Sequence, residues 1–311
     1  MRKRDFDMEK IQAEKTALAV YQTGRDDKAM LPHVIARVPL FTATRAPRAR
    51  AETGVTIERK TVWGDEVKIQ TLRRLYCDLD LTTFLSVIAL VQKHGISHYN
   101  LGDWDLFLSS FSVPELYHLT NIPRQMSEHL YESLRTLGAT NLTIKFGDKS
   151  PVAQGKVWES KAFWEFQIKS RPGRAGNLLT LNVNPLLVPN ERSLYADMEK
   201  LAKIRRPLSK AVFWVLLCRE HYRGTLDDWK ALLGVRDSKQ IRWLEGAFIP
   251  ALEDLEKIGY SWSMEEDKIR VSRRGNIVPN GPKNLHLNVK EPAPAPVRDI
   301  VIARVYSDDF S

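Results

Sequence analysis

The sequence predicts an α+β fold in which one order of helices and strands occurs twice. In each half, three segments carry apolar residues at helical spacing, and strands of alternating polarity follow them. In the first half the helices are predicted at residues 80–93, 113–120 and 124–137, and the strands at 141–146, 162–169 and 178–183. In the second half the helices are predicted at residues 208–222, 226–233 and from 238 onward, and the strands at 260–263 and 268–272. This order is typical of a helix-turn-helix followed by a wing, so we expect two tandem winged-helix domains.

Local signals define the elements of the first half. Residues 55–60 and 66–71 alternate in polarity, and the Gly64-Asp65 turn between them favours a hairpin. The helix over residues 80–93 ends before Gly95, because glycine is the usual C-terminal stop. Ser112-Val113-Pro114-Glu115 is typical of a helix start with proline in the first turn. The apolar face of the following long helix consists of Met126, Leu130, Leu134 and Leu137.

The second half repeats these signals. Residues 208–222, LSKAVFWVLLCREHY, form a strongly apolar segment, and a turn at 234–237 precedes the long helix. Asp237 is the predicted N-cap of that helix, and Gln240 completes a capping-box pattern. Its predicted inner face consists of Ile241, Leu244, Phe248, Leu252, Leu255 and Ile258.

Composition limits the class of protein. The 311 residues carry a formal net charge of +9, which favours a polyanionic partner such as nucleic acid. Cys77 and Cys218 lack metal-type spacing and fit a reducing cytoplasm. No apolar run is long enough to span a bilayer, and the basic start is followed by acids, unlike a secretory signal. We therefore expect a cytoplasmic protein without a membrane span, a metal or another cofactor.

We expect four parts along the chain. A loosely attached, flexible N-terminal arm occupies residues 1–38, and the first winged-helix domain, with DNA backbone contacts, occupies 39–199. The second winged-helix domain occupies 200–275, and a flexible Pro/Ala-rich tail occupies 276–311.

The start of the second long helix is the strongest candidate for sequence-specific DNA contact. In a helix-turn-helix, N-terminal residues of the second helix reach base edges in the major groove. The residues predicted to face outward there are Ser238, Lys239, Gln240, Arg242 and Trp243. Lysine and arginine pair with phosphate or guanine, and glutamine pairs with adenine. The cations that follow the wing and would grip backbone phosphate are Arg270, Arg273 and Arg274. The alternative is a solvated helix end, since two cations are common on any exposed helix.

The first half has a weaker candidate surface. The outward face of residues 124–137 mixes Arg124, Gln125 and Arg135 with acids, which repel phosphate. The nearby basic loops would instead hold backbone phosphates without reading sequence, through Lys149, Lys156, Lys169, Arg171 and Arg174. A solvated surface is again the alternative for each of these cations.

Enzyme signatures are missing from the sequence. There is no G-x-x-x-x-G-K-[ST] motif, and GDKS at residues 147–150 lacks its upstream glycine. The His-x-His of a rolling-circle nickase does not occur. His94 and His98 have metal-like spacing, but Gly95 breaks the helix between them. We expect no catalytic residue and no enzymatic activity.

Four runs of the chain resemble the iteron-plasmid replication initiators of the TrfA/RepA type. They are LFTATRAPRAR with VTIERKTVWGDEVKIQT (residues 40–71), LSSFSVPELYHLTNIPRQMSEHLYESLRTLGATNLTIKF (108–146), KLAKIRRPLSKAVFWVLLCREHY (200–222) and LLGVRDSKQIRWLEGAFIPALEDLEKIG (232–259). The resemblance covers roughly residues 39–274 and departs at Pro250, inside the long helix.

The resemblance implies a plasmid replication initiation protein. Such a protein binds direct repeats, called iterons, in the double-stranded plasmid origin and opens the adjacent AT-rich DNA. It recruits the host replicative helicase and the host initiator protein. The resemblance also implies a homodimer in equilibrium with a monomer, in which the first winged-helix domain (39–199) serves dimerisation and dimers repress their own gene. The residues that would read the iteron are Ser238, Lys239, Gln240, Arg242 and Trp243. Arg124 and Gln125 would be weaker matching positions in the first domain.

Two other functions stay open. A winged-helix transcription regulator without a replication role would use the same DNA contacts. Direct repeats beside an AT-rich stretch favour the initiator, whereas a single palindrome over a promoter favours the regulator. A relaxase or nuclease is opposed by the missing motifs and would reveal itself in a divalent-metal cleavage assay.

Overall fold

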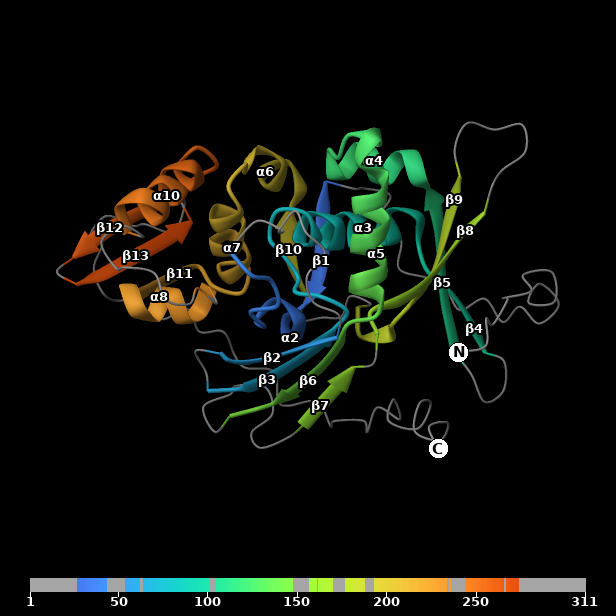
Figure 1. The fold of residues 1–311 in the computed structure, drawn as a ribbon, viewed down its shortest axis with the longest axis horizontal. Coiled ribbons are helices and arrows are strands. Elements are labelled where there is room, and N and C mark those ends of the chain that lie inside the picture. Colours follow the sequence, from blue (N-terminus) through green and yellow to red (C-terminus); the bar gives the residue numbers. More distant parts are fainter. Residues whose placement is uncertain are drawn as a thin grey trace, which may run out of the picture.

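The computed structural model describes residues 27–43, 54–61, 64–100, 105–147, 157–160, 162–169, 177–187, 193–233, 235, 244–265 and 267–273. Helices alternate with small antiparallel sheets in these segments, which confirms the α+β class (Figure 1). Residues 1–26 of the predicted arm and the predicted tail at 276–311 lie outside the described segments.

Helix α3 (Asp80–His94) is the central helix of the larger part of the molecule. Its apolar residues face every direction, so almost the whole helix is buried. Its neighbours are β1 (Lys28–Pro32), β5 (Asp105–Ser112), α4 (Val113–Thr120) and α5 (Ser127–Gly138). The helix ends as predicted, with Gly95 at φ 83°, a conformation that glycine adopts without steric cost.

The N-terminal segment from Lys28 is part of this core. Strand β1 pairs with β10 (Ser193–Asp197), and α2 (His33–Ala36) follows β1 directly. The side-chain amide of Gln92 in α3 both accepts from the Met30 N–H at 2.9 Å and donates to the Met30 carbonyl at 2.7 Å. The prediction of a loosely attached arm is therefore wrong for residues 28–38. The segment is too short to show helical or strand periodicity, and its partner strand lies about 165 residues further along the chain.

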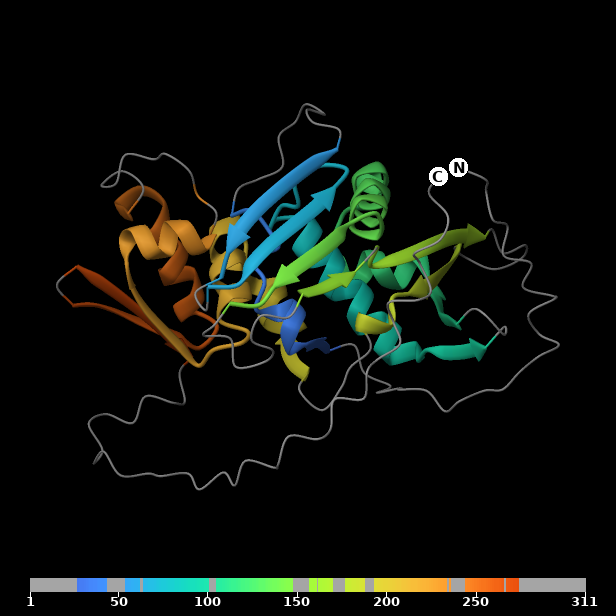
Figure 2. The ribbon, with the colours of Figure 1, turned by 90° about the horizontal axis from the view of Figure 1, so that it is seen from below.

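Two four-stranded antiparallel sheets flank α3. The first has the order β2-β3-β6-β7 and consists of β2 (Val55–Lys60), β3 (Glu66–Thr71), β6 (Asn141–Lys145) and β7 (Val157–Ser160). The second has the order β4-β5-β9-β8 and adds β4 (Ser97–Asn100), β8 (Trp164–Lys169) and β9 (Leu178–Val183) to β5. Figure 2 shows the first sheet lying across the helices when the molecule is seen from below. The predicted hairpin at residues 55–71 is confirmed, with Val55 opposite Thr71.

The C-terminal part begins after η3 (Pro185–Leu187) and α6 (Met198–Lys203). It consists of α7 (Pro207–Val215), β11 (His221–Thr225), α8 (Leu226–Leu233), η4 (Leu244–Phe248), α10 (Ile249–Glu256), β12 (Tyr260–Glu265) and β13 (Lys268–Arg273). Its three strands form a sheet of order β11-β13-β12. The prediction of one helix over residues 208–222 is wrong after Val215, because His221 and the residues that follow it pair with β13.

A single hydrophobic core joins the two parts of the chain. The Trp214 ring in α7 lies 5.1 Å from Phe41 and 6.2 Å from Phe84, measured between ring centroids. Lys210, one turn earlier, donates from Nζ to the Asp78 carbonyl at 2.9 Å and to the Thr82 hydroxyl at 2.8 Å. Burial lowers the pKa of Lys210, and the negative charge of Asp78 partly offsets this lowering. Figure 1 shows α7 between α3 and the C-terminal sheet.

In the part of the chain that the structure describes, no helix combines the length and hydropathy needed to cross a bilayer.

Candidate nucleic-acid interface

Helix α8 is the first helix of the predicted C-terminal helix-turn-helix, and its position depends on Trp229. This side chain is fully buried and meets Tyr222 edge-on at 4.8 Å and Phe248 at 5.3 Å between ring centroids. Its indole N–H donates to the Ile269 carbonyl in β13 at 3.0 Å. One residue therefore ties α8 to the strand before it, to the long helix after it and to the hairpin.

A capping box sets the start of α8. The Thr225 hydroxyl accepts from the Asp228 N–H at 3.2 Å, and the Asp228 carboxylate accepts from the Thr225 N–H at 2.8 Å. Gly224 just before it has no room for a side chain, because a Cβ there would lie 2.9 Å from the Tyr222 ring. The local sequence Gly-Thr-x-x-Asp thus converts strand β11 directly into helix α8.

The long helix predicted after α8 is described from Leu244 onward. Its described part consists of the π-helical turn η4 followed by the α-helix α10 from Ile249, with Pro250 in the first turn of α10. Proline has no N–H for the helical ladder, which accounts for the change of helix type at this point. Phe248, Leu252, Leu255 and Ile258 are buried, as the predicted inner face requires. The residues predicted to read DNA bases lie outside the described segments: Ser238, Lys239, Gln240, Arg242 and Trp243.

The β12–β13 hairpin presents cations on its exposed face. Arg270 is exposed and lies directly opposite Arg223 of β11 in the ladder. Like charges directly opposite each other in a sheet are unfavourable. Arg223 was not among the predicted contacts, although it immediately precedes the Gly-Thr of the capping box.

Arg273 differs from Arg270 in its surroundings. It is half-buried, and its Nη2 donates to the Leu216 carbonyl at 3.0 Å and to the Leu217 carbonyl at 3.3 Å. These bonds satisfy backbone groups at the C-terminus of α7, where a cation is favourable. Arg274 lies outside the described segments.

The same topology occurs earlier in the chain. We call α3, β5, α4, α5, β8 and β9 the first unit, and α7, β11, α8, η4, α10, β12 and β13 the second unit. Both units contain a helix, a strand, an eight-residue helix, a longer helix and two strands in this order, and the first unit has three further strands between them, β4 before β5 and β6 and β7 before β8. The three equivalent strands pair in the same spatial order, β5-β9-β8 and β11-β13-β12. In both, the first strand runs without a break into the short helix.

The short helix of the first unit also starts with a capping box. The Ser112 hydroxyl caps the Glu115 N–H, and the Glu115 carboxylate accepts from the Ser112 N–H at 3.0 Å. Burial raises the pKa of Glu115, but hydrogen bonds from Ser112 and His94 outweigh it and lower the pKa to about 2. His94 lies at the end of α3, and its Nε2 is 2.9 Å from the Glu115 carboxylate.

The long helix of the first unit is held rigidly against α3. Ser133 donates to Asp80 at 2.6 Å, and Asp80 also accepts from the Tyr76 N–H and from Arg73. The Trp164 indole of β8 donates to the Leu134 carbonyl of α5 at 3.1 Å. Gly138 allows the close approach of Trp164, since a Cβ there would lie 2.7 Å from its carbonyl oxygen.

The outward face of α5 has mixed charge, as predicted. The exposed residues on this helix and on the turn η2 (Arg124–Met126) before it include Gln125, Glu128, His129 and Arg135. The Glu132 carboxylate contacts Arg73 at 3.4 Å. Met126, predicted on the apolar face, is 40% exposed because the turn lifts it away from the core. The side chain of Arg124 and the loop cations Lys149, Lys156, Arg171 and Arg174 lie outside the described residues, whereas Lys169 is exposed at the end of β8.

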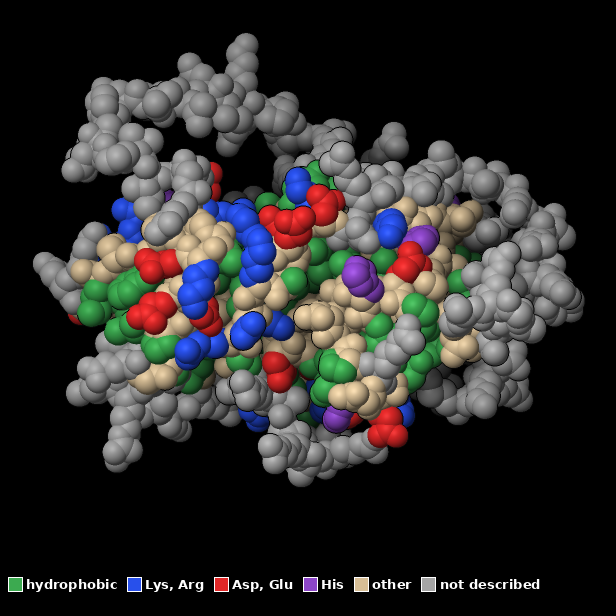
Figure 3. Space-filling view, turned by 90° about the horizontal axis from the view of Figure 1, so that it is seen from above, with side chains coloured by type: hydrophobic (Ala, Val, Ile, Leu, Met, Phe, Trp, Pro, Cys, Tyr) green, Lys and Arg blue, Asp and Glu red, His purple; other side chains and the backbone are tan. Residues whose placement is uncertain are grey.

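The exposed cations are unevenly distributed. Figure 3 shows lysine and arginine side chains gathered over the part of the surface that holds the second unit, with some acids among them. The two histidines with metal-like spacing lie in different surroundings, since His94 contacts Glu115 and His98 stacks on Phe107 at 4.6 Å. Among the described residues, no three His, Cys, Asp or Glu side chains gather closely enough to hold a metal ion.

A scan against protein-family models and a search of curated proteins found no match to this chain.

Proposed function

We propose that this protein is a plasmid replication initiator that binds double-stranded origin DNA through two tandem winged-helix domains. The observation that carries the proposal is that both units run from a strand directly into a short helix, then contain a longer helix, and pair their three strands in the same spatial order, with β6 and β7 as additional strands of the first half. A helix-turn-helix uses its second helix in the major groove, so each unit offers one such helix. The net charge of +9 favours a polyanionic partner.

In this proposal the two units have different tasks. The second unit reads direct repeats with Ser238, Lys239, Gln240, Arg242 and Trp243, and Arg270 contacts backbone phosphate. The first unit, whose long helix has a mixed face, contributes weaker contacts at Arg124 and Gln125 and mediates dimerisation. The bound protein opens AT-rich DNA, recruits the host helicase and host initiator protein in the cytoplasm, and uses no enzymatic step.

The resemblance to iteron-type initiators favours this function over that of a transcription regulator. A regulator built from the same two units would contact DNA through the same residues, so the DNA contacts alone do not separate the two functions. Replication does separate them. The gene supplied in trans should allow an origin that carries the direct repeats to replicate, and no replication of that origin would refute the initiator function.

The DNA contact itself is tested by Lys239→Ala combined with Arg242→Ala. We expect this variant to lose repeat-specific binding in a mobility-shift assay, because both changes remove predicted base contacts. Lys203→Ala combined with Arg205→Ala removes the same charge from two exposed positions and should keep the specificity. Unchanged repeat specificity in the first variant would refute the assignment of the recognition helix.

A further inference from the structure

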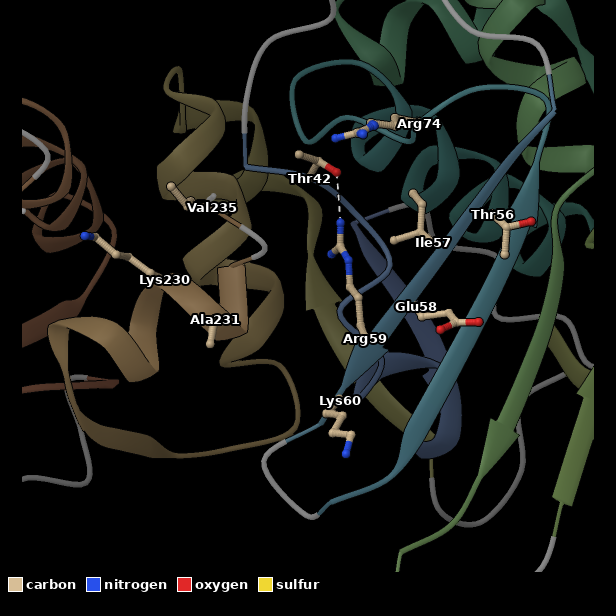
Figure 4. Close-up of a pocket in the computed structure, with 10 residues that line it drawn as sticks. All are labelled: Thr42, Thr56, Ile57, Glu58, Arg59, Lys60, Arg74, Lys230, Ala231 and Val235. Atoms are coloured by element: carbon tan, nitrogen blue, oxygen red, sulfur yellow. Dashed lines mark hydrogen bonds between the residues drawn. The ribbon is translucent and has the colours of Figure 1, made fainter. Parts of the chain in front are cut away.

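Strand β2 lies at the edge of its sheet and has a cleft beside it. Among the described strands, β3 is its one neighbour. A cleft of about 380 Å³ separates β2 from helix α8, and residues 56–60 form its β2 wall (Figure 4). Five residues of a strand extend over about 17 Å, so the cleft follows almost the whole of β2.

The backbone of β2 faces this cleft at every second residue. Where the β2–β3 hairpin closes, the Thr61 N–H donates to the Asp65 carbonyl at 2.9 Å. Bonded positions in an antiparallel pair recur every two residues, so the odd-numbered residues of β2 bond β3. The backbone N–H and C=O groups of the even-numbered residues point away from β3, and these residues line the cleft: Thr56, Glu58 and Lys60.

The opposite wall of the cleft is formed by small apolar side chains. Lys230 of α8 points away from β2, which leaves Ala231 and Val235 on that side (Figure 4). Ile57 adds an apolar side chain from β2. Extended peptides bind to sheet edges by strand addition, in which main-chain hydrogen bonds give affinity and pockets for alternate side chains give specificity. The second unit therefore gives the edge of β2 a shape that suits an added strand.

The chain contains a strand-like segment beyond its last described residue, Arg273. Residues 300–306, IVIARVY, include five β-branched or aromatic residues and no proline, glycine or acid. In an extended conformation Val301, Ala303 and Val305 share one face, because side chains alternate along a strand. Their small size suits a cleft whose apolar side chains are Ile57, Ala231 and Val235.

The spacer between Arg273 and this segment is long enough to reach β2. It consists of the 26 residues 274–299 and includes the Pro/Ala-rich run at 291–296. At about 3.1 Å per residue it can span up to about 80 Å. A folded chain of this length has a radius of gyration of about 20 Å, so β2 is within reach. A flexible tether also keeps a segment at a roughly millimolar effective concentration near its site.

We infer that residues 300–306 bind in this cleft as an additional strand, hydrogen-bonded to the edge of β2. The tether favours this segment over a separate peptide, and natural proteins commonly cover an exposed edge strand. The docked segment lies against Val235, whose N–H donates to the Lys230 carbonyl at 2.9 Å where the chain leaves α8. It thereby restrains the turn that leads to the predicted recognition helix. The inference does not depend on the proposed DNA binding.

Residue-resolved hydrogen exchange of the full chain tests the inference through the amides of the three even-numbered residues of β2. The test variant combines Ile302→Pro with Ala303→Pro, because consecutive prolines remove a donor whichever of the two residues faces β2. We expect these amides to exchange faster in this variant than in the wild type, by on the order of tenfold. The control combines Ala293→Pro with Ala295→Pro in the Pro/Ala-rich run and should exchange like the wild type.

A second pair of variants tests the cleft from its other wall. Ala231→Trp places an indole in the space that the added strand needs, whereas Ala202→Trp places one at an exposed position of α6 outside the cleft. We expect Ala231→Trp to show the same fast exchange in β2 as the proline variant, and Ala202→Trp to show wild-type exchange. Circular dichroism and urea denaturation check that both tryptophan variants are folded.

Each result decides for or against the inference. Equal exchange of Thr56, Glu58 and Lys60 in the wild type and the proline variant would refute it, even if Ala231→Trp exchanges faster, because another segment would then cover the edge. Protection that disappears on dilution, together with dissociation of a dimer in light scattering, would assign the strand to a second copy and also refute it. Protection that depends on residues 300–306 supports the inference even in a chain without repeat-specific DNA binding, so its failure and that of the proposed function are distinguishable.

Discussion

The indole N–H of Trp214 donates a 2.7 Å hydrogen bond to the carbonyl oxygen of Val38, and both residues are buried. This bond connects α7, the first helix of the second unit, to the N-terminal segment that packs against α3. The Trp214 ring also belongs to an aromatic cluster with Phe41 and Phe84. The two units therefore meet through packed side chains, and the fold sets the separation of their proposed DNA-contacting helices.

Replacing Trp214 by phenylalanine should destabilise the protein. The change removes one of two hydrogen bonds to the buried Val38 carbonyl, which keeps the bond from the Leu40 N–H at 2.8 Å, so we expect a loss of about 0.5–1.5 kcal/mol in unfolding free energy. Trp262→Phe is a matched control, because its buried Nε1 has no hydrogen-bond partner among the described residues. Urea denaturation should show the larger loss for Trp214→Phe. Equal losses would contradict a stabilising role for this hydrogen bond.

A buried ion pair anchors the turn of the β2–β3 hairpin. Arg37 Nη2 lies 2.5 Å from the Asp65 carboxylate, and both side chains are fully buried. Asp65 also accepts from the Thr61 hydroxyl at 2.8 Å and from the Gly147 N–H at 3.1 Å. Asp65→Ala removes the carboxylate that pairs with the buried Arg37, so we expect a loss of about 3–5 kcal/mol in unfolding free energy.

Two further variants qualify this expectation. Arg37→Met combined with Asp65→Leu removes both charges and should cost less than Asp65→Ala alone. Glu66→Ala, at an exposed carboxylate beside the same turn, should change the unfolding free energy by less than about 1 kcal/mol. A double variant as unstable as Asp65→Ala would show that the hydrogen bonds of Asp65, rather than its charge pairing, dominate.

Glu115 should make stability depend on acid pH. Its pKa in the folded protein is about 2, against an ordinary value of 4.5. A lowered carboxyl pKa stabilises the folded state above 4.5, and this contribution disappears as the pH falls from about 4.5 to about 2. Glu115→Gln should flatten the dependence of unfolding free energy on pH in this window. The exposed Glu253→Gln should retain it, and the same slope in both variants would contradict the prediction.

Arg270 and Arg273 should respond differently to alanine substitution. Arg270 is exposed opposite Arg223, so Arg270→Ala should keep the stability and reduce the salt slope of DNA binding by about one unit. Arg273 donates to the Leu216 and Leu217 carbonyls, so Arg273→Ala should lower the unfolding free energy by about 1–3 kcal/mol. Chemical denaturation and a salt titration of duplex affinity measure both effects. A stability loss in Arg270→Ala would remove the reason for assigning it to phosphate contact.

The sequence by itself determined the elements that depend on neighbouring residues. Strands β2, β3 and β9 and helices α4 and α8 have the predicted bounds, because alternation, capping residues and glycine stops act within a few residues. The repeated order of elements and the mixed face of α5 were also readable from local pattern. The residues proposed to read DNA come from this same pattern.

Only the tertiary structure decided the features that need a distant partner. Strand β1 depends on β10 and strand β11 depends on β13, so their residues carried no sufficient local signal. Asp65 was visible as a turn residue, but its pairing with Arg37 follows from packing. The cleft between β2 and α8 is lined by segments about 170 residues apart in the chain (Figure 4). Such contacts form where burial of the shared core outweighs local preference, and that balance involves residues far apart in the chain.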